Sequence, residues 1–139
     1  MQAWLITIVT GAISGITASL LTIFFTPRLQ HHFWKLQRRE ELRLGTINTL
    51  NKLTAEFITT YSREGSYKDP GEEFWQSLHA ALANVKALFS GGAYDLVERM
   101  AAMLAPNLGP EYEKRGIYDF ILARDAALRL LYQEIGILV

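Results

Sequence analysis

The chain has 139 residues, no cysteine, and 14 acidic and 14 basic side chains. The missing cysteines exclude disulfide bonds and thiolate metal sites, and the length suits one modest domain with a further segment. Five basic and two acidic residues lie between Arg28 and Arg43, whereas nine basic and twelve acidic residues follow from Leu44 onward, a net charge of −3. This acidic part lacks the basic surface that nucleic-acid binding requires.

The first predicted element is the uncharged segment from Ala3 to Phe25. About 20 apolar residues let a helix cross the hydrocarbon core of a bilayer, so residues 1–27 are predicted to form a transmembrane anchor. A cleaved signal peptide, the alternative, would have a basic start and a small-residue cleavage site. Cationic side chains follow the segment and none precedes it. The chain is therefore expected to be a single-pass membrane protein, with its N-terminus outside and its C-terminal domain in the cytoplasm.

Small and hydroxylated residues gather on one side of this segment when it is drawn as a helix. They are Thr7, Gly11, Ser14, Gly15, Ala18 and Thr22. Such residues let two helices approach closely in lipid, so we expect self-association through this stripe. A monomeric anchor, whose hydroxyls bond to carbonyls four residues earlier, is the alternative. The 4-3-4 spacing of Thr7, Gly11, Ser14 and Ala18 favours a left-handed crossing of the two helices. The pair Gly11 and Gly15 favours a right-handed crossing.

Residues 28–43 are predicted to form a basic helical stalk next to the membrane. Pro27 predicts a kink or a break before the stalk, because its ring collides with the carbonyl of Ile23. Basic and aromatic residues favour the headgroup region of a bilayer. Those expected at the membrane interface are Trp4, Arg28, His31, His32, Trp34, Lys35, Arg38 and Arg39. The alternative is that these residues are the ordinary flank of a membrane anchor and do not dock onto lipid headgroups.

Residues 44–139 are predicted to form a cytoplasmic bundle of about four mostly antiparallel helices. Apolar residues recur at spacings of three and four, and no run alternates with period two, so the predicted fold class is all-α. The first helix continues from the stalk to about Arg63. The residues expected to begin its core face are Leu44, Ile47, Leu50, Leu53 and Phe57. Gly45 marks either a hinge or a close contact.

Three further helices are expected after a loop at residues 63–71. Asp69 is predicted to cap the second helix, with Pro70 in its first turn. Ser90 is predicted to cap a third helix that ends near Ala105. The fourth is expected to run from Glu111 to about Ile135.

Arg124 is the one charged residue expected to lie partly inside the bundle. It shares a helix face with apolar residues, namely Ile117, Phe120, Ile121, Leu128 and Leu131. A buried guanidinium needs carboxylates or carbonyls around it. The candidate partners are Asp125, Asp95, Glu98 and Glu73. A buried ion pair that fixes the helix register, or an arginine that reaches the surface, is favoured over a ligand site.

No phosphate-binding loop, metal-ligand spacing or recognisable nucleophile turn is present, so neither a cofactor nor an enzymatic activity is predicted. The predicted function is that of a membrane-anchored scaffold or adaptor, a homo-oligomer that recruits a cytoplasmic protein partner by raising its effective concentration. The alternative is an oligomeric membrane-active effector or small channel component with a hydroxyl-lined stripe, although that stripe lacks the ionisable residues of most ion pathways. A membrane-bound enzyme is a third hypothesis.

Overall fold

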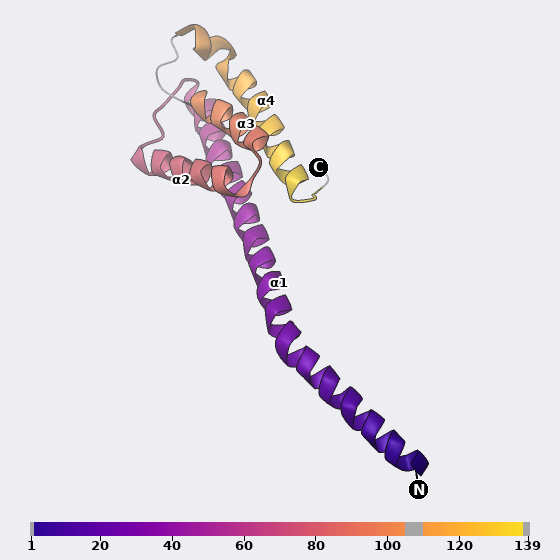
Figure 1. Ribbon diagram of the computed structural model, residues 1–139. Helices are drawn as coiled ribbons and strands as arrows, with labels where there is room; N and C mark the ends of the chain where they lie inside the picture. Colours follow the sequence, from indigo (N-terminus) through magenta and orange to yellow (C-terminus); the bar gives the residue numbers. More distant parts are fainter. Residues whose placement is uncertain (1, 105–109, 138–139) are drawn as a thin grey trace. The chain divides into compact units, whose positions relative to one another are not determined.

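The computed structural model contains four helices: α1 (Gln2–Glu64), α2 (Glu72–Leu88), α3 (Gly91–Ala102) and α4 (Pro110–Glu134) (Figure 1). The structure describes residues 2–104 and 110–137, with the side chains of residues 14–104 and 117–137. No strand occurs within these ranges, which confirms the predicted all-α class. The chain divides into two compact units, Met1–Arg38 and Arg39–Val139, and this boundary falls inside the predicted stalk.

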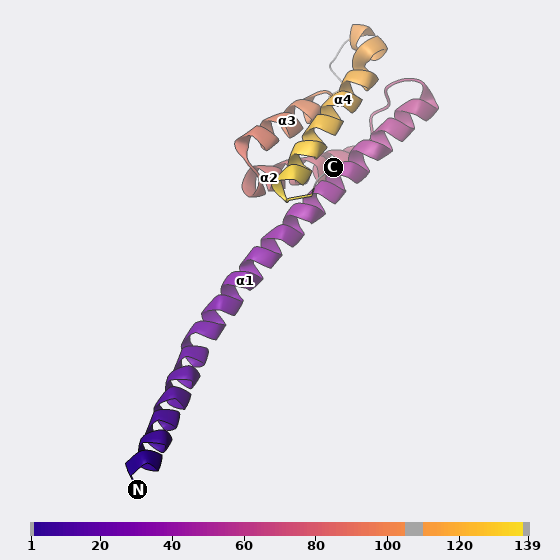
Figure 2. The same ribbon diagram turned by 90° about the vertical axis from the view of Figure 1, so that its right-hand side faces the viewer.

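The first unit consists of the N-terminal part of α1. The helix continues through Pro27 without a break, so the proline does not end it. Proline lacks an N–H and its ring crowds the carbonyl four residues earlier, which removes one helical hydrogen bond and bends the helix. The indigo and violet part of α1 is visibly curved (Figures 1 and 2).

The second unit is a helical bundle with its own core. α3 packs against both α2 and α4, and α3 and α4 lie side by side in both ribbon views (Figures 1 and 2). Every helix contributes buried apolar side chains. The core consists of Ile47, Leu50, Leu53 and Phe57 from α1, Phe74, Leu78, Ala81 and Val85 from α2, Ala93, Val97, Met100 and Ala101 from α3, Leu104, and Phe120, Ala127, Leu128 and Leu131 from α4.

Aromatic rings gather around Phe57 at one end of this core. The Phe57 ring meets Phe120 edge-to-face at a centroid distance of 5.4 Å, and it lies 6.4 Å from Phe74 and 6.0 Å from Tyr67. The Tyr67 hydroxyl donates to the Leu104 carbonyl at 3.2 Å. Burial, followed by the nearby Asp69 carboxylate, raises the pKa of Tyr67 above its ordinary value. Phe57 thus joins α1 to α2, α4 and the α1–α2 loop.

The predicted core face of α1 is confirmed at four of its five positions. Leu44 is the exception, because its side chain is 42% exposed. At 100° per residue, Arg43 falls between Ile47 and Leu50 around the axis of α1, whereas Leu44 falls about 60° from Ile47 on the side away from Leu50. Arg43, rather than Leu44, therefore faces the bundle at this level.

The predicted Asp69 cap of α2 is wrong. α2 begins at Glu72, and the preceding residue is Gly71, whose φ of 95° is open to glycine but strained for other residues. The Asp69 Oδ1 atom instead accepts from the Gly71 N–H at 3.0 Å and from Trp75 Nε1 at 2.9 Å. These donors, Gly71 first, lower the pKa of Asp69 below its ordinary value. The turn at Gly71 places Asp69 and Pro70 ahead of the helix.

The predicted Ser90 cap of α3 is confirmed. Its backbone is extended, and its Oγ accepts a hydrogen bond from the Ala93 N–H at 3.2 Å. A serine hydroxyl in this position satisfies one of the amides that a helix leaves unpaired at its N-terminus. The cap thus sets the start of α3 directly after the end of α2.

Candidate functional site

Large apolar side chains stand exposed along the described part of the uncharged segment. Each is at least half exposed: Ile16, Leu20, Leu21, Ile23, Phe24 and Phe25. At 100° per residue these positions point to several sides of α1. Apolar surface of this extent is rare on water-exposed helices and marks contact with a membrane or a partner.

The small-residue stripe of the same segment is described only in part. The Ser19 hydroxyl donates to the Gly15 carbonyl, and the Thr22 hydroxyl to the Ala18 carbonyl, each at 2.8 Å. The hydroxyl of Thr22 is therefore satisfied within its own helix. A Cβ added at Gly15 would meet no atom within 4 Å, so this side of the helix has room for another backbone.

Among the described residues, no helical stretch is both long enough and apolar enough to cross a membrane. Positions 3–13 of the uncharged segment lie outside the described side chains. Thr7 and Gly11 of the stripe and Trp4 of the expected interface fall in that part. The transmembrane helix stays a prediction from the sequence.

The predicted interface residues that the structure describes all lie exposed on α1. They are Arg28, His31, His32, Trp34, Lys35, Arg38 and Arg39. The rings of His31 and Trp34 stack with centroids 6.3 Å apart and an interplanar angle of 14°. The Trp34 side chain is 60% exposed, so its ring remains accessible to an outside partner.

Arg124 lies at the junction between α4 and α1, with its side chain 19% exposed. Its Nε donates to Thr54 Oγ1 at 2.9 Å, and its Nη2 to Asn51 Oδ1 at 2.6 Å. The carboxylate that it contacts is that of Asp125, at 3.2 Å, rather than Asp95 or Glu98. Glu98 instead accepts from the Tyr94 hydroxyl at 3.0 Å. The guanidinium therefore joins two helices through neutral side chains.

A second arginine, Arg43, forms a network that sequence reasoning did not find. Its Nε donates to the Leu88 carbonyl at 2.8 Å, and its Nη1 donates to the Glu134 carbonyl at 3.3 Å. Its Nη2 lies 3.7 Å from the Glu134 carboxylate, and its guanidinium lies 4.9 Å from the centroid of the Phe89 ring. Leu88 and Glu134 are the last residues of α2 and α4.

The Glu134 carboxylate extends this network to the start of α3. It accepts from the Ser90 N–H at 3.1 Å and from the Ser90 hydroxyl. A cation at the C-terminal ends of two helices and an anion next to the first turn of a third both suit the helix dipoles. Arg43 and Glu134 together hold α1, α2, α3 and α4 at one level of the bundle.

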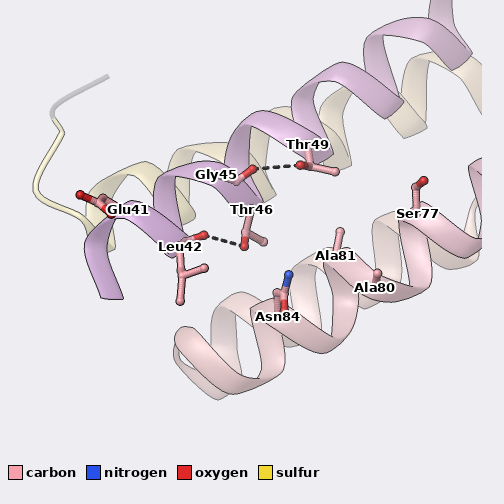
Figure 3. Close-up of a pocket in the computed structure, with 9 residues that line it drawn as sticks. All are labelled: Glu41, Leu42, Gly45, Thr46, Thr49, Ser77, Ala80, Ala81 and Asn84. Carbon is pink, nitrogen blue, oxygen red and sulfur yellow. Dashed lines mark hydrogen bonds between the residues drawn. The ribbon is translucent and has the colours of Figure 1, made fainter. Parts of the chain in front are cut away.

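A shallow groove of about 420 Å³ lies between α1 and α2 (Figure 3). Its lining consists of Glu41, Leu42, Gly45, Thr46, Thr49, Ser77, Ala80, Ala81 and Asn84. The Thr46 and Thr49 hydroxyls donate to the carbonyls of Leu42 and Gly45, so their methyl groups remain for contact. A Cβ on Gly45 would meet nothing within 4 Å, which excludes the predicted close contact there. With one carboxylate in its lining, the groove holds no acid–base pair.

No cluster of histidine and carboxylate side chains in the described ranges could hold a metal ion. The chain matches no protein-family model, no curated protein and no solved structure. The feature that most needs an explanation is the exposed apolar surface of the first unit.

Proposed function

We propose that the chain is a membrane-anchored helical scaffold that self-associates and recruits a cytoplasmic protein partner. The supporting observation is the exposure of Ile16, Phe24 and Phe25 in the first unit, whereas the second unit has a buried apolar core of its own. Burying apolar surface is worth about 25 cal/mol per Å², so water is an unfavourable environment for these side chains. The uncharged run that contains them extends back to Ala3, and a lipid bilayer offers the matching environment.

In this proposal residues 1–27 anchor the chain, and the bundle lies on the cytoplasmic side, where the cationic residues after Phe25 favour it. Tethering raises the effective concentration of whatever the bundle binds, and association of several anchors adds multivalency. In this proposal the bundle supplies binding surface rather than chemistry.

The alternative, a channel component with a hydroxyl-lined pathway, receives less support. The Ser19 and Thr22 hydroxyls already donate to carbonyls of their own helix. Hydroxyls that donate within their own helix favour dry packing against a second helix over a water-filled pathway. Conductance from the reconstituted oligomer would reverse this preference.

Self-association through the stripe predicts a specific crosslinking result. Replacing Gly11 and Ser14 with leucine should abolish most crosslinked dimer in membranes, because the larger side chains keep the two backbones apart. The matched control replaces Ile13 and Ile16, which lie on the opposite side of the helix at 100° per residue, with phenylalanine and should leave the dimer unchanged. Crosslinked species that persist in the Gly11→Leu/Ser14→Leu variant would place the interface elsewhere.

A further inference from the structure

The helical turns that follow Pro27 carry their positive charge on one side. Residues 28–38 contain three cations, two histidines and no carboxylate. All five fall within an arc of about 120° around α1 at 100° per residue. This cationic face consists of Arg28, His31, His32, Lys35 and Arg38. All five are exposed, and no ion pair joins the three cations to a carboxylate among the side chains that the structure describes.

An apolar strip runs along the same turns. Leu29, Phe33 and Leu36 fall within an arc of about 60°, centred about 130° away from the cationic face. Their side chains are between 46% and 65% exposed. A helix that carries Lys and Arg on one face, and Leu and Phe on another, is typical of helices that lie in the plane of a membrane surface.

We infer that α1 bends sharply at Pro27 when the chain is in a bilayer, because the proline removes a helical hydrogen bond there. Residues 28–38 then lie along the bilayer surface, and the cationic face binds the phosphates of anionic lipids. The inference rests on the proposed anchor to bring these residues to the bilayer, and it adds the lipid class and the direction of the helix. Anionic headgroups match the cations, and the acyl chains beneath them match the apolar strip. A nucleic acid would match the cations alone and leave Leu29, Phe33 and Leu36 in water.

The length of the cationic face separates a helix lying on the surface from one standing upright on it. Arg28 and Arg38 are about 15 Å apart along the helix axis, whereas salt screens charges beyond about 8 Å at physiological ionic strength. In an upright stalk, Arg28 would attract the lipid surface and Arg38 would contribute little. In a helix that lies along the surface, both cations contribute to a similar extent.

The test uses the full chain, labelled at one position. Because the chain has no cysteine, a Leu36→Cys variant takes a single environment-sensitive fluorophore on the apolar strip. The labelled chain is reconstituted in vesicles of phosphatidylcholine, with and without phosphatidylserine. We expect a blue shift, and quenching by brominated acyl chains, in the phosphatidylserine vesicles only. Both responses should weaken at high salt.

Charge variants then test the direction of the helix. Arg28→Gln and Arg38→Gln should each lower the apparent affinity for phosphatidylserine about fivefold. Arg63→Gln removes an exposed cation of the bundle and is the matched control, with no change expected. An effect of Arg28→Gln without one of Arg38→Gln would overturn the inference, since it describes an upright stalk.

Two further outcomes would also overturn it. The fluorophore could respond equally in both kinds of vesicle, which would remove the role of anionic lipid. Its response could instead rise with the protein-to-lipid ratio, which would assign the strip to a second copy of the chain. Alkaline extraction of the same vesicles tests the anchor separately. A chain that is extracted, yet binds phosphatidylserine vesicles from solution, removes the anchor and leaves this inference standing.

Discussion

Replacing Phe57 with alanine should lower the free energy of unfolding of the bundle by about 3–5 kcal/mol, the cost of removing a buried aromatic ring. The Phe57 side chain contacts rings from three other parts of the bundle, at centroid distances between 5.4 and 6.4 Å. Its removal leaves a cavity that Phe74, Tyr67 and Phe120 border together. The measurement is a denaturant titration of the full chain in detergent micelles, followed by circular dichroism.

Phe33 offers a matched control for this experiment. It is the same residue type on the same helix, but its side chain is 65% exposed, against 8% for Phe57. Phe33→Ala should leave the unfolding of the bundle unchanged. Equal effects of the two substitutions would mean that Phe57 is not the centre of the aromatic cluster.

Replacing Arg43 with methionine should lower the stability of the bundle by about 2–4 kcal/mol. Methionine retains most of the apolar stem but loses the hydrogen bonds to the Leu88 and Glu134 carbonyls. The C-terminal ends of α2 and α4 then lose their shared cation, which favours the negative end of each helix dipole. Hydrogen exchange of peptides from the ends of α2 and α4 should become faster than in the unchanged chain.

Arg39 is the control for Arg43, since it lies one turn earlier on the same helix and is exposed. Arg39→Met should change neither the unfolding midpoint nor the exchange at these helix ends. If Arg43→Met also leaves both unchanged, the network around Glu134 contributes nothing to the bundle, and the helices are held by apolar packing alone.

Local patterns in the sequence predict much of the bundle. The spacing of Ile47, Leu50 and Phe57 determines which side of α1 is buried, because an amphipathic helix has one apolar side to hide. Ser90 is a cap that a reader of the sequence can find, since the interaction lies within four residues. Asp69 fails as a cap because Gly71, two residues later, adopts a positive φ that the sequence pattern does not reveal.

The two arginines show where sequence reasoning ends. The apolar neighbours of Arg124 place it on the inner side of α4, but its contacts with Thr54 and Asn51 join residues that lie 70 and 73 positions away. The sequence assigns no partner to Arg43, although its guanidinium donates to a carbonyl 91 positions away. Such contacts depend on how the helices pack, and no local spacing carries that information.

The central claim is that the segment from Ala3 to Phe25 holds the chain in a lipid bilayer. Alkaline carbonate extraction of membranes that contain the full chain, followed by flotation on a density gradient, tests it most directly. Carbonate removes proteins that bind a membrane through charge and leaves those whose apolar segments enter the hydrocarbon core. We predict that the chain floats with the lipid after extraction. A chain that remains in the soluble fraction, without aggregating, would contradict the claim and with it the proposed tether.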